Sequence, residues 1–114
     1  MPCYKMVVLS RPVEGREAEF NDWYQHIHLG EIVAFRGFKS AQRFRRVRSL
    51  TGPGNYPYLA VYEIETDDIE SVLNEFESEA GQGALTMSEA FTTEFVQAGI
   101  YEECGSAVAA LESC

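Results

Sequence analysis

Apolar side chains recur at helical spacing in two stretches of this 114-residue chain. The first stretch has apolar residues at i, i+3, i+4 and i+7, namely Phe20, Trp23, Tyr24 and Ile27. This spacing predicts a helix from residues 14–16 to about residue 28, with these four side chains on its buried stripe. Residues 29–35 are expected to continue as a looser turn or a second short helix. The same spacing at residues 69–76 predicts another helix, ended by glycines at positions 81 and 83.

Four other stretches are rich in β-forming residues and predict strands: residues 3–9, 38–48, 57–65 and 93–103. In the second strand, alternation predicts Phe38, Ser40, Gln42 and Phe44 on one face and Lys39, Ala41, Arg43 and Arg45 on the other. In the third strand, Tyr58, Ala60, Tyr62 and Ile64 share a face. Residues 49–56 are expected to form a hairpin loop, residues 84–91 a short extra helix, and residues 105–114 a small-residue tail, in part a frayed helix.

The resulting order is βαββαβ, which predicts a ferredoxin-like α+β fold. It has a four-stranded antiparallel sheet with two helices on one face, in a single domain over residues 1–103 that is followed by a tail over residues 104–114. The strands carry apolar residues on both faces, so the face without helices needs a cover. A second copy of the chain would supply it, and we therefore expect a homodimer, the dimeric α+β barrel.

Composition narrows the functional classes. A net charge of −9 argues against a nucleic-acid partner. No run of 18 apolar residues and no leader-like N-terminus is present, which argues against a membrane span and against secretion. Three cysteines, Cys3, Cys104 and Cys114, are at no metal-like spacing and suit free thiols in a reducing cytoplasm.

The basic residues are unevenly distributed. Residues 36–48 contain six of the nine basic side chains, whereas 13 of the 18 acidic residues follow residue 48. One interpretation is a strand whose exposed arginines pair with the acidic second half, within the chain or across a dimer. The other is a funnel that attracts an anionic substrate.

His28 is the residue most suited to chemistry. At about 100° per residue it lies at the edge of the apolar stripe near Tyr24, whereas His26 faces the opposite side next to Asp22. A helix C-terminus favours the charged ring and partial burial favours the neutral one, so we expect a pKa close to neutrality, as a general base requires. The alternative is a core histidine satisfied by a backbone carbonyl. The two histidines diverge on a helix, so no metal site is expected.

The motif F-x-x-W-Y-x-x-x-H-L at residues 20–29, followed by R-G-F-K-S-A-Q-R-F at residues 36–44, resembles the EthD-like branch of the dimeric α+β barrel proteins. Gly30 stands where such proteins commonly have proline. The resemblance implies a cavity between the helices and the sheet, in which a histidine with nearby tyrosines does acid–base work. It makes His28, Tyr58 and Tyr62 the candidate catalytic residues, with Tyr4 as a further candidate tyrosine.

The remaining candidates, and Tyr4 with them, would bind substrate. Trp23, Tyr24 and Phe20 are core residues or the walls of a cavity for a flat molecule, and Glu31 is placed to orient the His28 ring. No dinucleotide, haem or nucleophile-elbow motif is present, and no cofactor is expected. We therefore predict a cofactor-independent lyase, isomerase or cyclase that uses histidine for proton transfer on a hydrophobic or aromatic carbonyl compound. The alternatives are a cofactor-free monooxygenase and a non-catalytic EthD-like accessory or binding protein.

Overall fold

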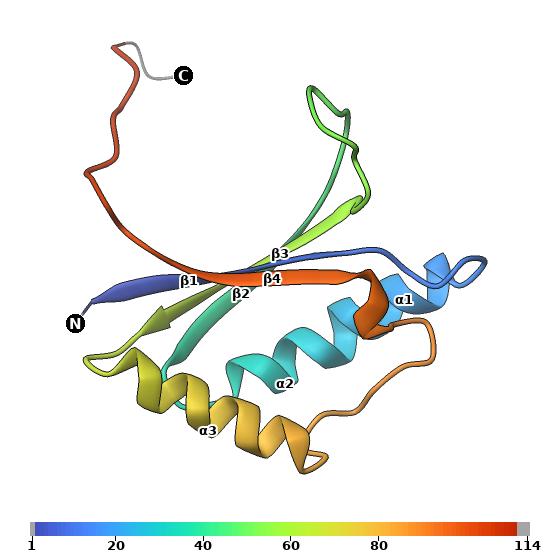
Figure 1. Cartoon of the computed structure of the whole chain (residues 1–114), viewed down its shortest axis with the longest axis horizontal. Helices are drawn as coiled ribbons and strands as arrows, with labels where there is room; N and C mark the ends of the chain where they lie inside the picture. The colour runs from blue at the N-terminus through green and yellow to red at the C-terminus, as the bar shows by residue number, and fades with distance from the viewer. Residues whose placement is uncertain (1, 112–114) are drawn as a thin grey trace.

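Four strands form one antiparallel sheet in the order β2-β3-β1-β4 (Figure 1). They are β1 (Cys3–Ser10), β2 (Phe38–Arg45), β3 (Tyr58–Glu65) and β4 (Val96–Glu102). The computed structural model describes residues 2–111. The helices α1 (Glu17–Trp23), α2 (Leu29–Val33) and α3 (Ile69–Gly81) all lie on one face of the sheet, and the ferredoxin-like α+β prediction is confirmed.

The core lies between that face and the helices. Tyr58, Ala60, Tyr62 and Ile64 of β3 are all buried, as their alternation predicts, and they pack with Phe20 and Tyr24 of the first helical segment and Val72 of α3. In β1, Met6 and Val8 point to the same side. Burial of these side chains is the main stabilising contribution, about 1.5–3 kcal/mol for each large apolar side chain.

The first helical segment contains a turn that its sequence pattern does not show. Between α1 and α2, residues Tyr24–His28 (η1) form a π-helical turn, in which the Leu29 N–H donates to the Tyr24 carbonyl five residues earlier. The wider turn rotates the following residues relative to a regular α-helix. Consequently Ile27, predicted on the buried stripe, is 41% exposed, whereas His28 is 7% exposed.

Of the two forms expected for residues 29–35, the second short helix is present: α2 continues through Gly30 to Val33. The chain then reverses at Gly37, which has φ of +92°. The Gly37 carbonyl accepts a hydrogen bond from the Glu65 N–H at 2.9 Å, so the turn is tied to the end of β3.

The predicted alternation of β2 is wrong at its first residue. A register shift between Phe38 and Ser40 places one extra residue in β2. Phe38 is therefore buried on the helix side with Ala41 and Arg43, rather than on the face of Ser40, Gln42 and Phe44. The strand also ends at Arg45, three residues earlier than expected.

Residues 84–92, here called the strap, connect α3 to the short 3-10 turn η2 (Thr93–Phe95) that precedes β4. The short helix expected at residues 84–91 is absent, and the strap crosses the helix side of the molecule as irregular chain. The tail has no helix over residues 105–111, contrary to expectation, and Cys114 lies outside the described residues. Within residues 2–111, no helix is long and apolar enough to cross a membrane.

Candidate functional site

His28 lies inside a cage of aromatic rings. Its ring stacks on Trp23 at a centroid distance of 4.4 Å and meets the edge of Tyr24 at 4.9 Å. The strap contributes the third wall, Phe91, whose ring centroid lies 6.0 Å from that of His28. The π-helical turn makes the stacking possible, because it brings residues i and i+5 onto one side of the helix.

The imidazole of His28 has one buried nitrogen, Nδ1, without a hydrogen-bond partner among the described residues. Burial lowers the pKa of His28 to about 4, against the smaller opposing effect of the Glu31 charge. The expectation of a pKa close to neutrality was wrong, because the helix continues through α2 and offers no C-terminal dipole at His28.

Glu31 holds the strap instead of orienting the His28 ring. Its carboxylate accepts hydrogen bonds from the Thr86 N–H and the Thr86 hydroxyl, both at 2.7 Å, and these bonds lower the pKa of Glu31. Trp23 Nε1 donates to the Thr86 carbonyl at 2.7 Å. Thr86 thereby connects the strap to both α1 and α2, directly beside the cage.

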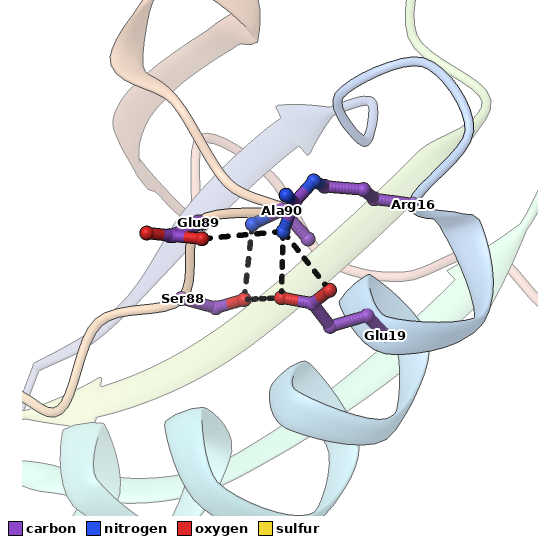
Figure 2. A network of polar contacts seen from close by, with 5 residues as sticks. All are labelled: Arg16, Glu19, Ser88, Glu89 and Ala90. Atoms are coloured by element: carbon purple, nitrogen blue, oxygen red, sulfur yellow. Dashed lines mark hydrogen bonds and ion pairs between the residues drawn. The ribbon is translucent and has the colours of Figure 1, made fainter.

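A second polar network fastens the other end of the strap to α1 (Figure 2). Arg16 Nη1 lies 3.1 Å from one oxygen of Glu19 and 3.4 Å from a carboxylate oxygen of Glu89. The Ser88 hydroxyl donates to Glu19 at 3.2 Å and accepts from the Ala90 N–H at 3.1 Å. These side-chain pairs are exposed, and such pairs typically contribute about 1 kcal/mol or less each. The strap is therefore held over the cage mainly by Thr86 and by its own buried residues.

Tyr62 and Tyr24 form a buried hydroxyl pair at 3.4 Å, with Tyr62 as the donor. Burial raises the pKa of both tyrosines, and the Tyr24 neighbour raises that of Tyr62 further. Both phenols therefore stay protonated at neutral pH. Tyr24 is the tyrosine that meets His28, and Tyr62 reaches the cage only through it.

The other predicted site residues lie apart from the His28 ring. Tyr58 donates a hydrogen bond to Glu17 and accepts one from Asn21 at 3.1 Å. Phe20 is fully buried between Tyr24 and Tyr58, with ring centroids 5.4 Å from each. Tyr4 lines a recess at the far end of β1 with Tyr101. His26 is exposed, with Nε2 3.9 Å from the Asp22 carboxylate, as the helical spacing predicted.

The cavity that the resemblance implied between helices and sheet is filled by side chains around His28. Surface recesses formed by the described residues include five with volumes of about 240 to 520 Å³, and His28 lines none of these five. Among residues 2–111, no cluster of three histidine, cysteine or acidic side chains is placed to hold a metal ion. Sequence reasoning missed Phe91 and Thr86, since an irregular segment has no period that would reveal which residues pack inward.

Solved structures with the same arrangement of elements settle the fold. An ethyl tert-butyl ether D (EthD) family protein from Bacillus halodurans C-125 superposes with a TM-score of 0.63 at 17% identity, over 90% of this chain and 99% of its own. The chain has an EthD-like fold. A "putative monooxygenase" from Shewanella loihica PV-4 shares this EthD-like fold, with a TM-score of 0.54 at 15% identity over 92% of this chain and 97% of its own. No protein-family model and no curated protein matches the sequence.

Proposed function

We propose that the protein is a cofactor-independent enzyme that moves a proton on a hydrophobic or aromatic carbonyl compound, with His28 as the proton acceptor. The supporting observation is the buried Nδ1 atom of His28, which has no partner among the described residues. Leaving such a group unpaired costs about 1–3 kcal/mol, and structural histidines normally avoid this cost with a backbone partner.

In the proposed reaction, the neutral imidazole removes a proton from the carbon next to the carbonyl and leaves an enolate. The protonated ring then returns the proton to the same or a neighbouring carbon. With a pKa of about 4, the ring is neutral at pH 7 and can accept a proton, but it is a weaker base than the near-neutral imidazole that the sequence predicted; its conjugate acid returns the proton readily. Tyr24, which remains protonated and accepts the hydrogen bond of Tyr62, would donate a hydrogen bond to the enolate oxygen.

Substrate would reach His28 after displacement of the strap. Phe91 is the side chain that would move, and the Thr86, Glu89 and Ser88 contacts are those that would open. Most of these contacts are exposed and individually weak, which suits a segment that opens without unfolding the sheet.

The test compares His28→Phe with His26→Phe. Wild-type protein is incubated in heavy water with a panel of aryl ketones, and deuterium incorporation next to the carbonyl is followed by NMR. We expect His28→Phe to lower the exchange rate by about 10²-fold, the usual contribution of a general base, while His26→Phe retains it. Thermal unfolding of both variants shows whether the fold is intact. Exchange that survives in a folded His28→Phe variant would contradict the proposal.

A cofactor-free monooxygenase is the second candidate, favoured by the description of the Shewanella loihica neighbour. In that case the Trp23, Tyr24 and Phe91 rings would surround a phenol that reacts with oxygen itself. Oxygen uptake with a panel of phenols, but no deuterium exchange into ketones, would select this function over the first.

The closed cage favours a third candidate, a non-catalytic binding or accessory protein. Among residues 2–111 the His28 ring is packed against Trp23, Tyr24 and Phe91, and the residue is 7% exposed, so little of it is open to a ligand. A thermal shift with small aromatic ligands, without turnover in either panel, would select this role.

We also propose that two copies pair through the sheet face that carries no helices. That face presents apolar side chains of neighbouring strands, including Val7, Leu59 and Val61. The hairpin loop at residues 46–57 and the tail both extend from this side of the sheet (Figure 1). Each carries almost fully exposed apolar residues, with Leu50 84% and Val108 95% exposed. Such residues are expected to bury against a partner.

Charge supports the same pairing. The hairpin loop is basic, with Arg46 and Arg48, whereas β4 ends at Glu102 and leads into Glu103. A two-fold axis perpendicular to the strands would place the hairpin loop of one copy beside the tail of the other, so that opposite charges meet.

Dimerisation is tested by comparing Val108→Asp with Met87→Asp. Met87 is 54% exposed on the strap, on the helix side, so it supplies a matched control with the same added charge. We expect Val108→Asp to weaken the dimer by about tenfold or more, because an unpaired carboxylate would be buried in the interface. Light scattering on a size-exclusion column, over a dilution series, measures the change. A wild-type chain that is monomeric throughout would contradict the proposal.

A further inference from the structure

A recess of about 520 Å³ opens between α1 and the end of β2, away from the His28 cage. Its wall combines side chains of α1 and η1 with side chains from the last residues of β2 and the first residue of β3. The residues that matter for its chemistry are Asn21, Asp22, His26, Arg43, Arg45 and Tyr58. Its volume is in the range of small-molecule sites.

Arg43 is a half-buried cation at the back of this recess. Its Nη2 atom donates to Asn21 Oδ1 at 2.7 Å, and its Nη1 atom donates to the Asn21 carbonyl at 3.4 Å. The guanidinium carbon lies 4.9 Å from the Tyr24 ring centroid and 5.3 Å from that of Tyr58. Stacking on aromatic rings and a neutral amide therefore fix the charge in place. No carboxylate among the described residues forms an ion pair with it.

Arg45 adds a second positive charge to the same recess. It lies two residues after Arg43 on the helix-facing side of β2, because residues i and i+2 of a strand share a face. Over the described part of the chain, the Arg45 guanidinium forms no side-chain hydrogen bond and no ion pair, and its charge acts on the neighbouring Tyr58. Two arginines thus line one recess without an ion-pair partner among the described residues, in a chain with 18 acidic and nine basic residues.

The acidic groups nearby limit which anion fits. Asp22 lies at the rim of the recess next to His26, with 3.9 Å between the carboxylate and Nε2. The Glu17 carboxylate accepts the hydrogen bond of Tyr58. These charges repel a doubly charged phosphate more strongly than a singly charged carboxylate. Phe44 and the Tyr58 ring offer contacts for an apolar body.

We propose that this recess binds the carboxylate of a small aromatic or apolar organic acid, with Arg43 and Arg45 as the anion-binding residues. Paired guanidinium donors match a carboxylate geometrically, and such charge-assisted hydrogen bonds are about twice as strong as neutral ones. The site does not depend on the proposed role of His28. It can exist whether the protein is an enzyme or a binding protein.

Isothermal titration calorimetry with benzoate, phenylacetate and the neutral amide benzamide tests the site. We expect the two carboxylates to bind with Kd of about 1 mM or tighter, and benzamide at least about tenfold more weakly. Arg45→Gln is expected to weaken benzoate binding at least about tenfold. The matched control is Arg48→Gln, which removes the same charge from an exposed residue of the hairpin loop outside the recess.

Arg43→Gln should weaken binding at least as much as Arg45→Gln, and its thermal unfolding shows whether the aromatic stacking around it survives. Three outcomes would overturn the proposal. They are no heat from either carboxylate up to about 10 mM, benzamide binding as tightly as benzoate, and equal affinity for benzoate in Arg45→Gln and Arg48→Gln. Deuterium exchange into ketones is not used here, so a failed catalytic proposal leaves this result unaffected.

Discussion

Acidification from pH 7 to pH 4 is expected to lower the free energy of unfolding by about 3 kcal/mol through His28 alone. Burial lowers the pKa of His28 to about 4 in the folded protein, against an ordinary value of 6.5. Between these two values the unfolded chain binds the proton and the folded chain does not. The contribution of the neutral His28 ring to the free energy of unfolding is therefore fully present above pH 6.5, and it is lost as the pH falls towards 4.

Urea unfolding of wild type and His28→Phe at pH 7, 6, 5 and 4 measures this contribution. Other groups titrate in the same range, so the informative quantity is the difference between the two pH profiles. His28→Phe should be less sensitive to acid by about 3 kcal/mol over the range, whatever its stability at pH 7. His26→Phe serves as the control for the substitution itself, because it makes the same histidine-to-phenylalanine change at an exposed position of the same helical segment. Parallel profiles for wild type and His28→Phe would show that the ring is hydrated in solution.

Gly37→Ala is expected to destabilise the protein by about 2–4 kcal/mol, and Gly15→Ala by only about 1–2 kcal/mol. Both glycines have positive φ, +92° at Gly37 and +82° at Gly15, so both substitutions carry backbone strain. A Cβ at Gly37 would also lie 2.9 Å from Cγ2 of Val72, whereas at Gly15 it would meet nothing within 4 Å. Val72 is buried and β-branched, so its side chain has little freedom to move away.

Chemical denaturation of the two glycine variants at constant pH measures both values. The difference between the two losses of free energy of unfolding isolates the contribution of the clash between the Gly37 turn and Val72 of α3. Equal destabilisation would mean that α3 shifts to relieve the clash, and the turn at Gly37 would then not be held against Val72 in solution.

The sequence predicts the secondary structure and the fold class because both are encoded by local periods. Alternation in β3 correctly places Tyr58, Ala60, Tyr62 and Ile64 on the buried face. Spacing in α3 correctly places Val72 in the core. These patterns survive in the structure because a strand or helix must bury one face against its neighbours, and few arrangements of βαββαβ do so.

Register within those elements is where the sequence interpretation fails. One π-helical turn at residues 24–28 exposes Ile27 and buries His28, and one register shift after Phe38 moves that side chain to the other face of β2. The π-helical turn and the register shift each insert one extra residue into a regular backbone pattern. Neither has a local signature, because each depends on contacts far along the chain: Phe91 for His28, and Tyr62 and Phe76 for Phe38.

In the candidate site, too, some features follow from the sequence and others only from the tertiary structure. By its residues alone, the sequence determined that aromatic rings and His28 gather on one helix, and that a basic cluster lies in the following strand. Only the tertiary structure decided that the strap closes over His28, that Glu31 binds Thr86, and that Arg43 stacks on Tyr24 and Tyr58 beside an open recess. The physical reason is that local periodicity sets which face of an element is apolar. The pKa, the hydrogen-bond partners and the exposure of each side chain depend on residues far away in the chain.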